Sequence, residues 1–424
     1  MIRSVVKRLR RLRSRQITLG ATPQDQPDPP TRALGHRPPL DGIRGLAILG
    51  VLMLHSTIWG AMPTLLPGGN LGVTVFFVLS GYLITTLLLS EHERTGRIDL
   101  RSFYLRRAAR LLPGMVVLLP VYVIVLWGQE SAWQLVLLVG PVVLYLSSFV
   151  QAIWGAMGPL AWTWSLSVEE HFYACWPPAL RWLLNGERSR RPGLRGCLRR
   201  HPLVVASGAA AAVVVVSTAL RVYVTGTTQW NEFAYYATPT RLDALAIGCL
   251  VGLFGYRYSS PLPRLAGWVA LGAIGWCYAN PAFGIGGDSL NLYGLPLCEV
   301  AAAVLILSVV NRPTGLLARA LSLRPLVHLG VISYGLYLWN LLPGQTWTMI
   351  VGSHAGVAGT ALLFGVIFGA VELSYRYVEQ PAMRWAKARL AGSEKRGPVA
   401  ARRRYGVLGP RRLAREGVGS RAAG

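Results

Sequence analysis

Apolar stretches of about twenty residues recur along most of the chain and are separated by short polar or basic segments. A stretch of this length is sufficient to cross a lipid bilayer as an α-helix. Eleven stretches have this character: 43–62, 71–89, 111–128, 133–152, 160–183, 202–222, 237–256, 264–280, 293–310, 328–350 and 355–376. The pattern predicts an all-α polytopic membrane protein.

The basic segments between these stretches indicate how the helices are oriented. The positive-inside rule assigns five segments to the cytoplasm: the N-terminal tail, 94–110, 184–201, 311–325 and the C-terminal tail. An even number of crossings is then required between residues 111 and 184, where three candidates lie. We therefore expect 133–152 to be re-entrant or interfacial, and we predict about ten transmembrane helices.

This topology divides the chain into three parts. We expect a disordered basic tail over 1–39, a transmembrane domain over 40–383 and a basic tail over 384–424. Both tails are predicted to be cytoplasmic, and the chain to be a multi-pass protein of the cell (inner or plasma) membrane.

Composition supports this interpretation and excludes several function classes. Apolar residues make up 52% of the chain and charged residues only 14%, yet the net charge is +25; a soluble domain carries about a quarter charged residues. The basic excess lies mostly in the tails and loops, so we expect contact with membrane lipids and not with nucleic acid. The five cysteines form no C-x-x-C pair, and no phosphate-binding glycine loop or metal-ligand motif is present. We therefore expect no metal site.

The first apolar stretch contains two ionisable side chains, Arg44 near its start and His55 eleven residues later. Eleven residues make almost three turns of an α-helix, so both side chains point to roughly the same face, about 16 Å apart along the axis. Ionisable groups at membrane depth usually face a protein interior or a wet cavity. The pair suits an enzyme working across a bilayer, although a lone histidine in an apolar helix is more often structural.

Two further segments carry charges near the membrane boundaries. Arg107 and Arg110 have i, i+3 spacing and can grip phosphate groups, or they simply form a basic cluster that keeps the loop in the cytoplasm. Glu169 and Glu170 lie in an aromatic frame, where a carboxylate can orient or protonate His55, pair with Arg241, or form a purely structural ion pair. The expected topology places both arginines at the inner surface and both glutamates in the outer half of their span.

The later spans add three polar segments. Arg241 and Asp243 stand at the outer start of their span, where they either contact substrate or pair with each other at a capped helix end. Tyr337 and Asn340 bring a hydroxyl and an amide into a span and can line a polar cavity. The small residues Gly72, Ser80 and Gly81 predict close packing between helices.

Taken in order, these segments resemble the acyltransferase 3 family of integral membrane acyltransferases over residues 37–384. The resemblance rests on six motifs: Leu40-Asp41-Gly42-Ile43-Arg44 with His55, the stretch Phe76 to Gly81, Arg107-x-x-Arg110, Trp164-Ser165-Leu166-Ser167-Val168-Glu169, Thr240-Arg241-Leu242-Asp243, and Ser333-Tyr334-Gly335-Leu336-Tyr337-Leu338. Many family members have a histidine where this chain has Asn340.

The resemblance implies an enzyme that moves an acyl group, often acetyl, from cytoplasmic acyl-coenzyme A to a hydroxyl of a sugar-containing or lipid-linked acceptor. Acyl-coenzyme A would be a co-substrate, with no permanently bound cofactor. It implies His55 as the base and Arg44, Arg107 and Arg110 as coenzyme A or structural anchors, and it points to Glu169 as the important acid.

Two further sets of residues complete the expected site. Glu169 and Asp243 are candidates for orienting the imidazole or holding acceptor hydroxyls. The candidate substrate contacts are Trp164, Arg241, Tyr337 and Asn340. Acceptor preference is expected to reside in the membrane domain and in the loops 63–70, 223–236 and 281–292.

The expected reaction is direct transfer, in which neutral His55 takes the proton of the acceptor hydroxyl as the oxygen attacks the thioester. A covalent acyl-histidine intermediate is the less economical variant. The rival function is a transporter or flippase of a glycan or lipid-linked precursor, because charged groups at the midplane also mark transport pathways. That function predicts substrate movement without dependence on coenzyme A.

Overall fold

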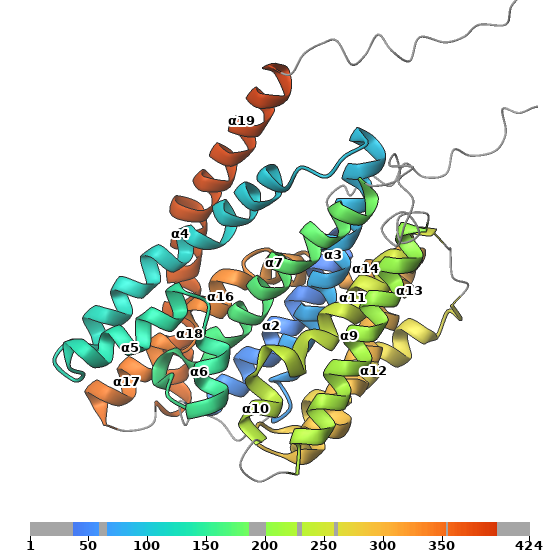
Figure 1. The fold of residues 1–424 in the computed structure, drawn as a ribbon. Helices are drawn as coiled ribbons and strands as arrows, with labels where there is room; N and C mark the ends of the chain where they lie inside the picture. The colour runs from blue at the N-terminus through green and yellow to red at the C-terminus, as the bar shows by residue number, and fades with distance from the viewer. Residues whose placement is uncertain are drawn as a thin grey trace, which may run out of the picture.

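The computed structural model describes residues 37–58, 66–185, 201–226, 231–257, 262–352 and 355–396, and these residues form helices without strands (Figure 1). The all-α prediction is confirmed. The helices are α2 (Pro38–Ile58), α3 (Leu71–Thr95), α4 (Leu100–Leu126), α5 (Ala132–Val143), α6 (Ser147–Trp154), η1 (Gly158–Thr163), α7 (Trp164–Leu184), α9 (Pro202–Val224), α10 (Asn231–Tyr236), α11 (Thr238–Arg257), α12 (Ala266–Ala279), η2 (Pro281–Phe283), η3 (Leu290–Gly294), α13 (Leu295–Asn311), α14 (Leu316–Leu321), α15 (Arg324–Val331), α16 (Ser333–Trp339), α17 (Leu342–Val351), α18 (Gly356–Ser374), η4 (Tyr375–Glu379) and α19 (Gln380–Arg396).

Five of the described helical segments are long and apolar enough to cross a membrane: Leu71–Thr95, Leu100–Leu126, Pro202–Val224, Leu290–Asn311 and Gly356–Ala391. A sixth is obtained if Arg324–Val331 and Ser333–Val351, bent by 60°, count as one span. The expected number of about ten is not confirmed. One reason is length: at about 1.5 Å per residue, the 14 residues of α12 fall short of a hydrocarbon core of about 30 Å.

The segment that we expected to be re-entrant or interfacial does not form one helix. It divides into α5 and α6, with Tyr145 in a left-handed conformation (φ 55°) between them. The Arg-rich segment 94–110, which we expected to be a cytoplasmic loop, is helical over most of its length. Residues 100–110 form the first turns of α4, which continues through Pro113 and Pro120 to Leu126. Arg107 and Arg110 therefore belong to a helix packed against the bundle.

Helix α3 is the centre of the bundle and packs against α2, α7, α11 and α13. Glycines make the tightest of these contacts. A Cβ at Gly81 would lie 2.0 Å from the carbonyl oxygen of Leu245, and one at Gly248 would lie 2.1 Å from that of Val78. The backbones of α3 and α11 thus touch in both directions, as the small residues predicted.

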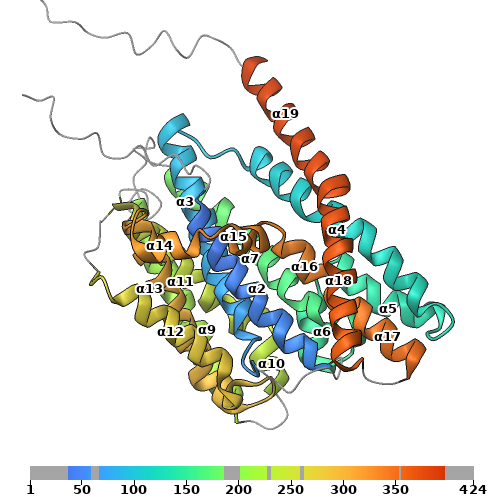
Figure 2. The same ribbon diagram turned by 180° about the vertical axis from the view of Figure 1, so that it is seen from behind.

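Helix α2 is held in the same way at its first turns. A Cβ at Gly42 would lie 1.8 Å from the carbonyl oxygen of Leu321, and one at Gly45 would lie 2.2 Å from that of Leu326. These contacts fit α2 against α14 and α15, and Figure 2 shows α2 crossing the centre of the bundle. The close fit fixes the direction in which the Arg44 side chain projects.

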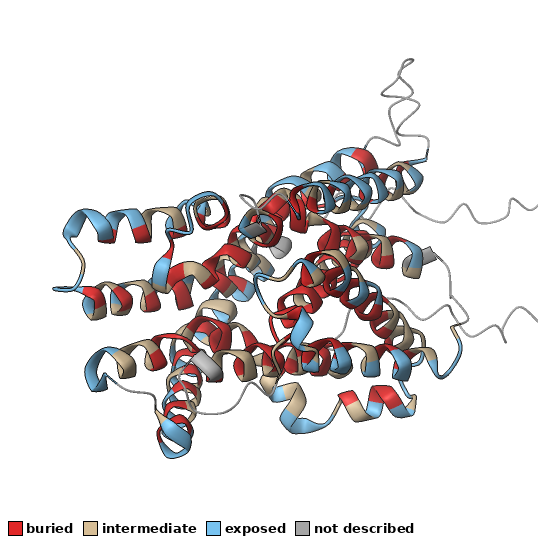
Figure 3. Cartoon of the chain, turned by 90° about the horizontal axis from the view of Figure 1, so that it is seen from below, coloured by how far each residue is buried: buried red, intermediate tan, exposed pale blue. Residues whose placement is uncertain are grey.

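Buried residues face the centre of the bundle, and the outward faces of the helices are exposed (Figure 3). Many exposed residues are large and apolar; Val116, Ile124, Trp133 and Val215 are each more than 60% exposed. An apolar outer surface of this kind suits lipid contact. Helix α19 extends beyond the rest of the bundle (Figures 1 and 2), and residues 384–396 of the expected C-terminal tail belong to it. The N-terminal tail to residue 36 lies outside the described residues.

Candidate active site

A cavity of about 80 Å³ lies among α2, α3, α4, α7 and α16, and we refer to it as the arginine cavity. Its apolar lining includes Phe76, Phe77 and Leu111. Its polar lining consists of Arg44, Ser80, Arg107, Arg110, Ser165, Glu169, Ser333, Tyr334 and Tyr337. Three arginines and one glutamate line the cavity, so its charge is net positive. The three arginines that the sequence suggested as anchors are therefore brought together.

Glu169 is held in this cavity by three donors. Arg107 Nη2 donates to Glu169 Oε2 over 2.7 Å, and the Tyr173 hydroxyl donates to the same oxygen over 3.0 Å. Ser80 Oγ donates to Glu169 Oε1 over 2.8 Å. The Arg107 guanidinium also lies 3.7 Å from the centroid of the Tyr173 ring, an arrangement that favours the cation. Glu169 is thus a fixed carboxylate that orients Arg107.

This geometry corrects the expected separation of an inner basic cluster from an outer cluster of mixed charge. Glu169 forms an ion pair with Arg107, and Glu170 Oε1 lies 3.7 Å from Arg107 Nε. Because α4 continues the Arg-rich segment as a helix, its arginines reach the level of the α7 carboxylates. Glu169 therefore neighbours the arginine cavity, and its expected contact with His55 or Arg241 is not among the observed interactions.

His55 is positioned by Asn340 of the turn that follows α16. The Asn340 Nδ2 group donates to the carbonyl oxygen of Tyr337 over 2.5 Å, which turns Asn340 Oδ1 towards His55 Nδ1. An amide oxygen only accepts, so His55 Nδ1–H is the donor of the bond between them. The neutral imidazole then carries its lone pair on Nε2, which is the state that a general base requires.

Tyr337 connects the histidine to the arginine cavity. Its hydroxyl lines the cavity and donates to the carbonyl oxygen of Trp162 over 2.8 Å, and it lies 2.6 Å from Ser165 Oγ. Its carbonyl oxygen holds Asn340, which in turn holds His55. His55 itself does not line the cavity and is eleven residues further along α2 than Arg44, about 16 Å along the helix axis.

Arg241 lies in an aromatic box formed by side chains of α3, α7 and α10. Its guanidinium carbon is 5.8, 5.6 and 5.2 Å from the ring centroids of Phe77, Trp164 and Tyr235. Nη2 donates to Thr74 Oγ1 over 2.9 Å, while Nε and Nη1 are buried without a hydrogen-bond partner in the described structure. Phe77 belongs to both the box and the cavity lining, so Arg241 adjoins the cavity without lining it.

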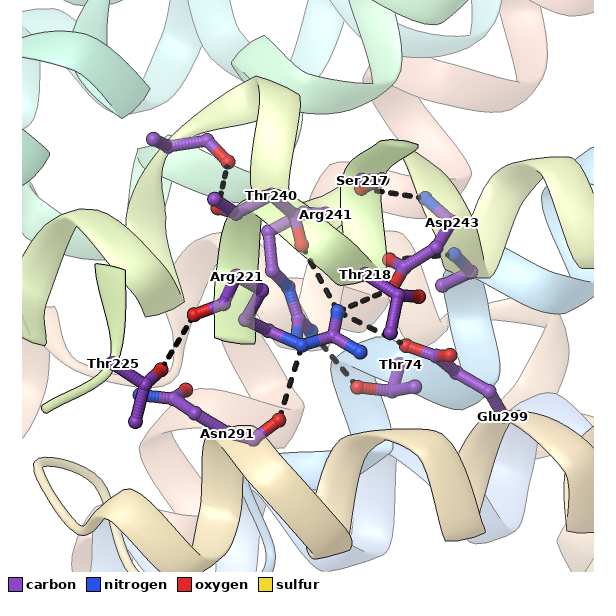
Figure 4. A network of polar contacts seen from close by, with 12 residues as sticks. Thr74, Ser217, Thr218, Arg221, Thr225, Thr240, Arg241, Asp243, Asn291 and Glu299 are labelled. Carbon is purple, nitrogen blue, oxygen red and sulfur yellow. Dashed lines mark hydrogen bonds and ion pairs between the residues drawn. The ribbon is translucent and has the colours of Figure 1, made fainter. Parts of the chain in front are cut away.

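Asp243 belongs to a separate buried network (Figure 4). It pairs with Arg221 of α9 and accepts a hydrogen bond of 3.1 Å from Thr218. Glu299 of α13 lies 3.7 Å from the same guanidinium. The expected roles of Asp243, orienting His55 or pairing with Arg241, are therefore not the ones observed. Arg241 and Asp243 are close neighbours in the sequence of α11, but their side chains point to different helices.

The sequence analysis did not single out Arg221 and Glu299, both of which are almost completely buried. Each is a charge inside an expected span, at 202–222 and 293–310, and such residues usually face a partner within the bundle. The position of a charge inside an expected span was therefore a signal in the sequence that could have identified both residues. Among the described residues, no group of three or more His, Cys, Asp or Glu side chains could hold a metal ion.

Comparisons with known proteins identify relatives of this chain. The O-acetyltransferase OatA of Staphylococcus aureus strain NCTC 8325 / PS 47 is 29% identical over 362 residues, which cover 81% of this chain and 57% of that protein. OatA of strain COL has the same identity and coverage. The chain thus spans little more than half the length of these relatives. No solved structure matches. The model of a family described as an acyltransferase domain matches residues 38–375, and the chain therefore belongs to the acyltransferase 3 family.

Proposed function

We propose that this chain is a membrane O-acyltransferase that moves an acyl group, acetyl in the first instance, from cytoplasmic acyl-coenzyme A to a hydroxyl of a sugar-containing acceptor. The family and the O-acetyltransferase name of the OatA relatives support the reaction class. The arginine cavity would face the cytoplasm of the cell, with both termini on that side, as the basic loops favour.

The arginine cavity is the proposed donor site. Its three guanidinium groups can pair with phosphates of coenzyme A in the bidentate geometry that arginine favours. A volume of about 80 Å³ is well below the range of about 300–1,000 Å³ that is typical of small-molecule sites, so the cavity can receive a phosphate-sized group but not the whole coenzyme. We therefore expect the remainder of the coenzyme to lie outside the cavity and the thioester arm to run towards His55.

The chemistry is assigned to the free Nε2 of His55. As the acceptor oxygen attacks the thioester carbonyl, Nε2 takes the hydroxyl proton. A C–O bond forms, the C–S bond breaks, and the proton passes from His55 to the departing thiolate, which leaves as free coenzyme A. The observation that carries this proposal is the Asn340 hydrogen bond, because it leaves the Nε2 lone pair available.

The test is acetyl-coenzyme A turnover by the purified protein in nanodiscs, followed by release of free thiol in the presence of glycoside acceptors. His55→Ala should abolish acceptor-dependent release. His328→Ala is the matched control, since His328 is an exposed histidine that pairs with Glu372 away from the cavity, and it should retain activity.

Full activity in His55→Ala would refute the assignment of the base. Transport of an acceptor by the wild type without any thiol release would refute the transferase itself.

A further inference from the structure

A second cavity, of about 560 Å³, lies between the start of α12, the end of α13 and α14, and we refer to it as the α12–α14 pocket. This volume is in the range of about 300–1,000 Å³ that is typical of small-molecule sites. Its lining includes Arg264, Trp268, Asn311, Arg312 and Leu316. None of its lining residues also lines the arginine cavity, so the pocket is separate from the proposed donor site.

The pocket carries positive charge without a matching carboxylate. Arg264 precedes α12 and Arg312 follows α13, so two guanidinium groups from different elements contribute to one pocket. Among the described residues neither arginine forms an ion pair with an acidic side chain. Arg312 donates one hydrogen bond of 2.8 Å to the carbonyl oxygen of Leu262, which leaves its other N–H groups for an anion.

The remaining lining supplies both polar and apolar contacts. Ser308 Oγ lines the pocket and is buried without a hydrogen-bond partner in the described structure. Leu316, at the rim, is 73% exposed. An anion with an attached apolar portion satisfies these features better than a soluble anion does, because the exposed leucine would remain in water beside a soluble ligand.

An apolar track leads away from the pocket along α12. Leu265, Val269 and Trp276 are 71%, 69% and 55% exposed. Their spacing of four and then seven residues puts them on one face of the helix. The track begins one residue after Arg264 and follows α12 away from the pocket, so an acyl chain anchored at the arginines would lie along it.

The pocket lies at the same end of the bundle as Arg44. A Cβ at Gly267 of α12 would lie 2.4 Å from a side-chain carbon of Leu317 of α14, and α14 contacts the first turns of α2 through Leu321 and Gly42. In Figure 2, α14 lies beside the upper end of α2. With the orientation given under the proposed function, this end faces the cytoplasmic leaflet, where basic pockets bind anionic lipid headgroups.

We propose that the α12–α14 pocket binds the phosphodiester head of an anionic phospholipid, with Arg264 and Arg312 on the phosphate and an acyl chain along α12. The lipid is a structural ligand and takes no part in acyl transfer. The phosphodiester chemistry is shared with soluble phosphate esters, and the track along α12 favours the lipid.

The test is native mass spectrometry of the full chain released from a neutral detergent and titrated with lipids of identical acyl chains. Phosphatidylglycerol should bind at least about tenfold more tightly than phosphatidylcholine, and a tenfold excess of glycerol 3-phosphate should not displace it. The variant Arg264→Ala/Arg312→Ala should lose this preference. The control Arg319→Ala/Arg324→Ala removes two exposed arginines that do not line the pocket and should keep it.

A charge-preserving variant, Arg264→Lys/Arg312→Lys, should keep the preference for the anionic lipid and so separates loss of the site from loss of the fold. Equal affinity for the two lipids overturns the proposal, as does an unchanged preference in the double alanine variant. Displacement by glycerol 3-phosphate assigns the pocket to soluble phosphate esters and also overturns it. None of these readouts depends on acyl transfer, so failure here is distinguishable from failure of the proposed function.

Discussion

Asp243→Asn is the substitution that best separates a structural role from a catalytic one. Asp243 and Arg221 are both fully buried and form an ion pair. The substitution keeps the size of the side chain and removes its charge. Removal of one partner from a buried pair typically costs about 3–5 kcal/mol, because the remaining charge is left without compensation in a low-dielectric interior.

The structure indicates a value near the lower end of that range. Glu299 Oε1 remains 3.7 Å from Arg221 Nη1, and the carbonyl oxygens of Asn291 and Thr240 still accept from the guanidinium at 3.1 and 3.0 Å. We therefore expect a loss of about 3 kcal/mol in the free energy of unfolding, which corresponds to roughly a hundredfold change in the unfolding constant.

The assay is chemical unfolding in detergent micelles followed by far-ultraviolet circular dichroism. Asp288→Asn is the matched control, since Asp288 is exposed, and it should change the unfolding free energy by less than about 0.5 kcal/mol. The folded fraction of Asp243→Asn should retain acetyl transfer, because the network shares no residue with the arginine cavity. An Asp243→Asn protein of normal stability and lost turnover would refute this reasoning.

Three further predictions follow from particular contacts. Gly81→Val should destabilise the fold by about 1–3 kcal/mol or more, because its Cβ would meet the Leu245 carbonyl. The yield of folded protein in size-exclusion chromatography should fall, and a normal yield and unfolding curve would contradict the close α3–α11 contact. Asn340→Leu should slow turnover by about fivefold without changing the yield, through loss of a hydrogen bond of about 1 kcal/mol that positions His55, whereas wild-type kcat would remove Asn340 from the site. Hydrogen bonds from Ser102 hold the pKa of Asp99 below its ordinary value. The stability that this α4 N-cap contributes is therefore present above the unfolded-state pKa near 4 and is lost as the pH falls below it. Across pH 3–6, the difference in unfolding free energy between wild type and Asp99→Ala should shrink at low pH, and a constant difference would contradict the prediction.

Local pattern was sufficient for the features that depend on one helix. Hydrophobic stretches predicted an all-α membrane protein, and helical spacing predicted that Arg44 and His55 share a face of α2. The small residues Gly72 and Gly81 predicted helix contacts, since a single residue without a side chain is sufficient for two backbones to approach. Ser80 was expected to pack, but its hydroxyl donates to Glu169 instead.

Features that join distant segments could not be obtained in this way. The Arg107–Glu169 pair spans 62 residues, and the expected topology put Arg107 at the inner surface and Glu169 in the outer half of its span because it treated the start of α4 as a loop. The pairing of Asp243 with Arg241, one of the two expected alternatives, is replaced by the pair with Arg221, since proximity in sequence does not decide which neighbouring helix a side chain meets. The expected number of spans is not confirmed, because hydropathy does not distinguish helices long enough to cross the bilayer from shorter apolar ones such as α5 and α12.

The central claim is that one chain combines a donor site at the arginine cavity with a base at His55. The most direct test compares kcat and KM for acetyl-coenzyme A in His55→Ala, Arg110→Ala and wild type, measured by thiol release in nanodiscs at saturating acceptor. We predict that Arg110→Ala raises KM by at least about tenfold with a smaller effect on kcat, because it would remove one of the proposed phosphate contacts. His55→Ala should lose kcat while acetyl-coenzyme A still binds. Unchanged KM in Arg110→Ala together with wild-type kcat in His55→Ala would contradict the account.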